Sequence, residues 1–149
     1  MTVIGQPNPP LKPEWNAFIH WIFSRCGSVV TLPPHAMDAA TSLGGSGPAL
    51  AALCMEGLAD GGVAMGIPRV QANQMAAQVL KGTAALVQSG EHPAILREKV
   101  STPGGCTIGG LLVLEEEGVR GKISRAVREA TVVATELGKG KQGANGTRW

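Results

Sequence analysis

The segment from Gly47 to Met65 constrains the fold more than any other part of the chain, because it predicts a helix that is apolar on almost every face. Its leucines are joined by alanine and glycine, so the helix is thin as well as apolar. A helix without a polar face must be buried on all sides, which is hard to achieve in one chain of 149 residues. We therefore expect this helix to be shared with a second subunit. The alternative is that it forms the central core helix of a monomer.

The composition excludes several functional classes. Hydrophobic residues make up 44% of the chain and charged residues 16%, with a formal net charge of +2. The chain is too apolar for a disordered segment and too neutral for a protein that binds nucleic acid electrostatically. No apolar run approaches the roughly 20 residues that span a bilayer. We therefore expect neither nucleic acid nor a membrane as a partner.

The cysteines and the first residues of the chain predict a cytoplasmic location. Cys26, Cys54 and Cys106 are widely separated and contain no CxxC pair. An odd number of thiols without a secretory signal is typical of a reducing compartment, and the first twelve residues show no basic region followed by an apolar core. Neither the cysteines nor the three histidines have the spacing of a metal site, so we expect no bound metal.

The remaining pattern predicts an all-α chain with no sheet. Pro13 opens a helix whose apolar residues recur every three or four positions until Gly27 ends it. Residues 28–32 predict a brief strand or an extended link, and further helices are expected over 37–39, 47–65, 67–89, 93–99, 106–115 and 119–137. The helix over 67–89 is expected to bury Val70, Ala76, Val79, Leu80, Thr83, Leu86 and Val87. The predicted organisation is an N-terminal segment with a Trp/Phe-rich amphipathic helix (1–26), a helical domain (27–138) and a flexible tail (139–149).

Two glycine-rich segments, residues 44–48 and 102–107, are the candidate ligand sites. Each places glycines and a hydroxyl group directly before a predicted helix. The first N–H groups of a helix lack internal partners and the helix dipole adds positive charge there, so such a segment suits a carboxylate or an oxygen that gains negative charge. Ser46 and Thr107 can donate further hydrogen bonds. The alternative is that Ser46 and Thr102 are ordinary N-caps and the glycines only allow helices to pack.

Other candidates for chemistry are weaker. Cys106 lies at a predicted helix N-terminus, where a thiolate would be stabilised, but the sequence places no histidine to activate it. Glu56 and Asp60 lie one turn apart on the apolar helix, as a catalytic acid pair could. Capping and packing beside the following glycines is the favoured interpretation of these two acids.

Five motifs follow one another over about residues 27–138. They are the segments 38–49 (DAATSLGGSGPA), 56–63 (EGLADGGV), 65–69 (MGIPR), 90–93 (GEHP) and 102–108 (TPGGCTI). In order and spacing these motifs resemble the C-terminal domain of pyrroline-5-carboxylate reductase. The resemblance implies an all-helical dimerisation domain whose long helices interlock with those of a second subunit.

The resemblance also implies roles for individual residues. In the family, the imino-acid carboxylate sits at the loop that matches residues 102–107, and the position of Thr107 supplies a hydroxyl close to the substrate ring. Thr107 is therefore the candidate catalytic residue. The candidate substrate-binding residues are Ser46, Gly47, Thr102, Gly104, Gly105 and Cys106.

The chain also departs from the family pattern. Family members begin with a dinucleotide-binding βαβ domain, whereas no predicted strand here is followed by GxGxxG. Gly44, Leu50 and Cys106 replace residues that are usual in the family, and the Trp-rich first helix has no counterpart that we recognise. Without a nucleotide-binding fold nothing positions a nicotinamide, so we expect no cofactor.

The favoured hypothesis is a homodimeric, reductase-like enzyme that has lost the NAD(P)-binding domain and uses the remaining pocket for non-redox chemistry. Oriented backbone donors can stabilise an enolate or a developing oxyanion. Cyclisation, isomerisation, dehydration or an aldol-type step on a carbonyl, imine or carboxylate substrate in a biosynthetic pathway would suit such a site. The alternatives are a non-catalytic dimerisation or binding module, a partner that completes a full-length reductase in trans, a separately expressed reductase domain and an inactive remnant. The expected partners are a second copy and a small anionic or carbonyl-bearing ligand.

Overall fold

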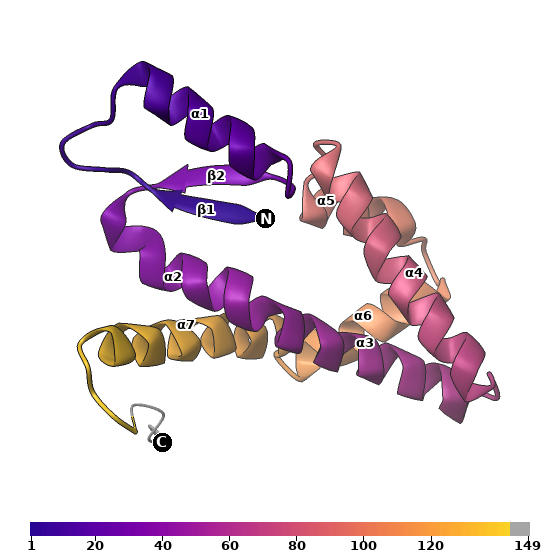
Figure 1. Cartoon of the computed structure of the whole chain (residues 1–149). Helices are drawn as coiled ribbons and strands as arrows, with labels where there is room; N and C mark the ends of the chain where they lie inside the picture. The colour runs from indigo at the N-terminus through magenta and orange to yellow at the C-terminus, as the bar shows by residue number, and fades with distance from the viewer. Residues whose placement is uncertain (144–149) are drawn as a thin grey trace. The chain divides into compact units, whose positions relative to one another are not determined.

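The computed structural model describes residues 1–143, which form a series of helices and one two-stranded sheet (Figure 1). The predicted all-α class is confirmed apart from this small sheet. The chain divides into two compact units, one made of Met1–Pro48 with the segment from Ser124 onward, the other of Ala49–Ile123. The elements are β1 (Thr2–Gly5), α1 (Pro13–Ser24), β2 (Val29–Leu32), a 3₁₀ turn (Pro34–Ala36), α2 (Met37–Thr41), a π-helical segment (Ser42–Ser46), α3 (Gly47–Ala64), α4 (Arg69–Gln88), α5 (Pro93–Val100), α6 (Cys106–Glu116) and α7 (Val119–Gly138).

The first unit contains a βαβ arrangement that corrects the prediction of no sheet. β1 and β2 pair in parallel, with Thr2 opposite Val29 and Gly5 opposite Leu32, and α1 is the crossover between them. The Thr2 N–H donates to the Ser28 carbonyl at 2.8 Å. β2 confirms the short strand predicted within residues 28–32. β1 escaped prediction because four residues are too few to show a periodic pattern, and its partner lies 27 residues further along the chain.

The sheet of the first unit is covered by helices of the same unit. α1 contacts β2 and α2 contacts β1. The Met37 sulfur approaches so near Gly5 that a Cβ there would lie 3.5 Å from it. The outward aromatic residues of α1 are exposed, with Trp15 and Trp21 each 56% accessible. The predicted boundary after residue 26 falls between α1 and β2 of this arrangement.

The end of α7 is tied to α2 and to the residues that follow it. The Thr135 hydroxyl donates to Asp38 Oδ2 at 2.7 Å, which joins α7 to α2. Glu136 accepts from Lys139 Nζ at 3.2 Å and from Lys141 Nζ at 3.1 Å. These two lysines belong to the predicted flexible tail, of which residues 144–149 lie outside the described part of the chain.

The contribution of Glu136 to stability at the end of α7 is expected to depend on pH, because the two lysines lower its pKa. Hydrogen bonds from Lys141 and then Lys139, reinforced by their positive charges, hold the pKa of Glu136 below its usual value. A carboxylate with a lowered folded-state pKa contributes its full stabilisation above the unfolded-state pKa, and that contribution is lost as the pH falls through the folded-state pKa. NMR titration should show the pKa of Glu136 rising toward its ordinary value in Lys141→Gln. An unchanged pKa in that variant, or an equal rise in Lys81→Gln, would contradict the assignment.

The core of the second unit lies between α3 and α4 and is built from small side chains. Ala59, Ala72 and Ala76 are 2%, 3% and 6% exposed, and partly buried residues on both sides pack against them. A Cβ added to Gly62 would lie 3.4 Å from Ile67 Cδ1. Small residues let helix backbones approach closely, so the thin helix predicted from the sequence, α3, packs against α4 through its small side chains.

Large apolar side chains elsewhere on these two helices remain exposed within a single subunit. Leu53 is 67% accessible, Leu58 53%, Met75 55% and Val79 56%. Leu58, Met75 and Val79 border one hollow, and grouped apolar surface of this kind marks an interaction face. Among residues 1–143, no helix combines the length and the apolar character that crossing a membrane requires.

Candidate functional site

The second glycine-rich segment forms the connection between α5 and α6. α5 ends at Val100, and Ser101 follows it with an extended backbone. The Ser101 N–H donates to the Glu98 carbonyl at 3.0 Å, and the Ser101 hydroxyl donates to the Arg97 carbonyl at 2.8 Å. Ser101 thus satisfies two carbonyls at the end of α5 and fixes the start of the loop, although the sequence pattern does not single it out.

The N-terminus of α6 is open. Its N-cap residue is Gly105, and no side chain caps the helix. The interpretation of Thr102 as an ordinary N-cap is therefore wrong. Uncapped N–H groups at the first turn of an 11-residue helix, together with the helix dipole, favour an anionic guest.

The loop conformation requires both of its glycines. Gly104 has φ +68°, a left-handed conformation. At Gly105 an added Cβ would collide with the Thr102 hydroxyl and lie 3.1 Å from the Thr102 carbonyl oxygen. The Gly105 N–H donates to that carbonyl at 3.0 Å and closes the turn.

Replacing Gly104 is expected to destabilise this turn in a graded way. Alanine at φ +68° costs about 1 kcal/mol or more, whereas asparagine tolerates the left-handed region better. Urea unfolding should give a lower free energy for Gly104→Ala than for Gly104→Asn, with wild type above both. Equal stability of the alanine variant and the wild type would show that the positive φ is not required.

The structure brings five of the predicted site residues together: Thr102, Gly104, Gly105, Cys106 and Thr107 all belong to this single turn. Thr107 is half-buried, and within residues 1–143 neither its hydroxyl nor that of Thr102 hydrogen-bonds another residue. Cys106 is exposed at the first position of α6.

The first glycine-rich segment differs from its prediction. Residues 42–46 form a π-helical segment that continues α2 directly into α3, and Gly47 has the helical angles φ −50° and ψ −43°. Ser46 and Gly47 therefore do not stand at the mouth of a helix, and Ser46 is not an N-cap. Any role of these two residues in binding substrate would have to come from the widened π turn, a feature often found at functional sites.

Asp60, one member of the candidate acid pair, and His92 have structural partners. Asp60 Oδ1 accepts from Arg69 Nη1 at 2.6 Å, which joins α3 to α4 and agrees with a packing role for this acid. His92 caps α5, its Nδ1 accepting from the Ala94 N–H at 3.2 Å. Within the described residues, no three His, Cys, Asp or Glu side chains gather where they could hold a metal ion.

Curated relatives match the whole of this chain. A pyrroline-5-carboxylate reductase of Lophium arboricola is 64% identical over 149 residues, which are 100% of this chain and 47% of the relative. The pyrroline-5-carboxylate reductase of Neurospora crassa is 66% identical over 99% of this chain and 45% of its own length. The chain thus spans about half the length of the relatives it matches. Because these matches include residues 13–24, the Trp-rich first helix has a counterpart in the family, contrary to expectation.

A solved structure shares both the fold and the family. Plasmodium falciparum pyrroline carboxylate reductase with NADP bound superposes with a TM-score of 0.77 and 29% identity, covering 86% of this chain and 49% of the other. The names of the relatives overturn the favoured hypothesis of cofactor-independent, non-redox chemistry, since every one of these proteins is a reductase. That hypothesis was based on the lack of a strand followed by GxGxxG. This motif indicates where a nucleotide binds and says nothing about the chemistry of the substrate pocket.

The match extends to a model of the domain itself. Residues 34–137 fit the family description "Pyrroline-5-carboxylate reductase dimerisation". A dimerisation domain self-associates, which accounts for the apolar surface that one subunit leaves exposed. Family, fold and the open loop before α6 agree with the resemblance in the sequence, and the chain belongs to the pyrroline-5-carboxylate reductase dimerisation family.

Proposed function

We propose that this chain supplies the dimerisation surface and the imino-acid site of a pyrroline-5-carboxylate reductase, and that another part of the assembled enzyme binds the nucleotide. The observation that carries the proposal is the uncapped N-terminus of α6 behind Gly104 and Gly105. Its N–H groups suit the carboxylate of pyrroline-5-carboxylate. The Thr107 hydroxyl is placed one residue into the helix, where it can donate to the same ligand.

The connection between β1 and α1 does not fit the phosphate-binding turn of a dinucleotide site. A dinucleotide-binding unit places its pyrophosphate on backbone N–H groups of a glycine-rich turn between the first strand and the helix. Here the connection from β1 to α1 contains Pro7, Pro9 and Pro10, which have no N–H to donate. This connection therefore does not supply the backbone N–H groups that a pyrophosphate needs.

The β1–β2 pair supports assembly with a nucleotide-binding portion. Parallel strands occur almost only in larger sheets, and a two-stranded sheet is marginal alone. The outer edges of β1 and β2 have no further strand partner within the described residues. A nucleotide-binding portion, in the same polypeptide or in a partner, would extend this sheet.

The proposal includes a homodimer with interlocked helices. Gly57 and Gly61 of α3 have no atom within 4 Å of an added Cβ, so the chain itself does not use the space beside them. A helix of a second copy would fill that space and cover Leu53 and Leu58. The three free cysteines agree with a cytoplasmic enzyme, and the small net charge agrees with a small anion in place of nucleic acid as the ligand.

The test is reconstitution of the reductase. NADPH oxidation in the presence of pyrroline-5-carboxylate would be followed for two proteins. The first is the chain alone, and the second is the chain joined to the part of the Neurospora crassa relative that this chain does not match. We expect no turnover by the chain alone, turnover by the joined protein, and at least a dimer by light scattering in both. A joined protein that is dimeric and binds NADPH but does not reduce the imino acid would contradict the proposal.

A further inference from the structure

We propose that Glu115 is a positioning residue for the site, because it holds α5 at the angle that presents the loop of residues 101–105. The inference rests on the proposed function at one point only, the assignment of the substrate carboxylate to this loop. Glu115 lies near the end of α6, far along the helix from the loop, so it acts through other residues.

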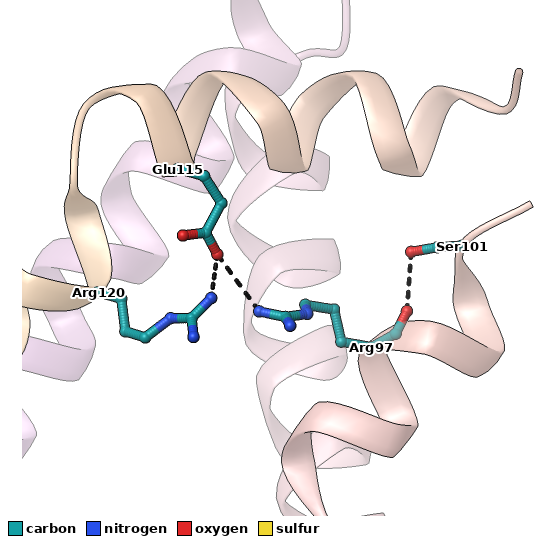
Figure 2. Close-up of polar contacts among 4 residues, drawn as sticks. All are labelled: Arg97, Ser101, Glu115 and Arg120. Carbon is teal, nitrogen blue, oxygen red and sulfur yellow. Dashed lines mark hydrogen bonds and ion pairs between the residues drawn. The ribbon is translucent and has the colours of Figure 1, made fainter.

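Glu115 joins two other elements to α6. Its Oε1 accepts from Arg97 Nη1 of α5 at 3.3 Å and also from Arg120 Nη2 in the first turn of α7 (Figure 2). One carboxylate oxygen therefore accepts hydrogen bonds from two guanidinium groups, one on the helix before α6 in the chain and one on the helix after it. Charge-assisted hydrogen bonds of this kind are stronger than neutral ones.

Arg97 connects this ion pair to the loop. Its side chain binds Glu115, while its backbone carbonyl accepts from the Ser101 hydroxyl at 2.8 Å (Figure 2). Ser101 is the first residue of the loop. A displacement of Arg97 therefore moves the acceptor that fixes where the loop begins.

Close packing does not replace this connection. An open hollow of about 360 Å³ lies along α5 and α6, with Ile108, Leu111 and Leu112 along its apolar part. Arg97, Ser101, Glu115 and Arg120 also border the hollow. The ion pair between Arg97 and Glu115 bridges α5 and α6 at the border of this hollow, where apolar packing between the two helices is incomplete.

The ion pairs are partly exposed, which limits their effect on global stability. The side chains of Arg97 and Glu115 are 40% and 49% accessible. Exposed pairs contribute little to the free energy of unfolding, so loss of Glu115 should loosen the loop before it unfolds the domain. The chain offers a matched control in Glu117, which pairs with Lys122 of α7 at 3.6 Å and, among residues 1–143, forms no ion pair with α5.

Hydrogen exchange on the full chain tests the positioning role without any assay of function. We expect the amides of residues 101–107 to exchange about two- to five-fold faster in Glu115→Gln, which matches the small free energy of a partly exposed charged contact. Their exchange rates should stay unchanged in Glu117→Gln. Adding Arg97→Gln to Glu115→Gln should accelerate exchange no further if Glu115 acts through Arg97. Unchanged exchange in Glu115→Gln, equal acceleration in Glu117→Gln, or additive effects of the two substitutions would each overturn the inference.

Kinetics of the joined reductase provide the second readout. In Glu115→Gln we expect the KM for pyrroline-5-carboxylate to rise about two- to five-fold while the KM for NADPH stays unchanged, because only the loop is displaced. A parallel change in both constants would indicate general destabilisation and overturn the inference. An inactive wild-type joined protein would refute the proposed function, while the exchange experiment would still decide the role of Glu115.

Discussion

Ala72→Asp is expected to unfold the α3–α4 pair and abolish self-association. Ala72 is 3% exposed and packs against Ala59 in the small-residue core of the second unit. An aspartate there would be charged and buried, and Arg69, one turn earlier on α4, is already paired with Asp60. An uncompensated buried charge costs about 3–5 kcal/mol, a large part of the roughly 5–15 kcal/mol that stabilises a domain. Circular dichroism should show a loss of helix, and light scattering a loss of the dimer.

Gln78→Asp is the matched control for this prediction. It introduces the same charge into the same helix, but Gln78 is exposed on the polar face of α4. We expect its unfolding free energy to lie within about 0.5 kcal/mol of wild type. If Ala72→Asp kept the helical signal and the dimer of the wild type, the core between α3 and α4 would not be what holds this unit together.

The buried stripe predicted for α4 shows where sequence reasoning reaches its limit. Ala76 is buried as predicted, but Val70 and Val79 of the same stripe are 64% and 56% exposed. Helical periodicity identifies which face is apolar, yet it does not say whether α3 or a second subunit covers each position. Ala72 and Ala76 pack in the core with Ala59 of α3, while Val70 and Val79 stay exposed in one subunit, so one periodic pattern contains both buried and exposed apolar positions.

The two glycine-rich segments were predicted with unequal success for a physical reason. At residues 102–107, Gly104 and Gly105 meet a local requirement, a positive φ and a steric limit, that the sequence states directly. At residues 44–48, glycine and proline also suggested a loop, but Pro48 stands one residue into α3, directly after the π-helical segment. Proline is tolerated in the first turn of a helix, and the preceding π turn already departs from the α-helical hydrogen-bond pattern, so the chain passes through without a break.

Thr107→Val is expected to cause the largest loss of activity among substitutions that leave the fold intact. Valine has nearly the shape of threonine and lacks the hydroxyl, and Thr107 makes no hydrogen bond within residues 1–143 that the change would break. A hydrogen bond to a charged group contributes about 1.5–3 kcal/mol, more than the roughly 1 kcal/mol of an ordinary one. The kcat/KM of the joined reductase for pyrroline-5-carboxylate should therefore fall about tenfold or more.

Two further variants separate the hydroxyl of Thr107 from the general loss of a threonine. Thr107→Ser keeps the hydroxyl and should recover most of the activity, although its rotamer is less restricted. Thr83→Val removes a hydroxyl that donates to the Val79 carbonyl within α4, at 2.8 Å, and to no other group among residues 1–143, so it should leave kcat/KM unchanged. Because all three variants change a single helical position, circular dichroism should give them the same spectrum. Activity retained in Thr107→Val would place the substrate on the backbone N–H groups of α6 alone, and would remove Thr107 from the site.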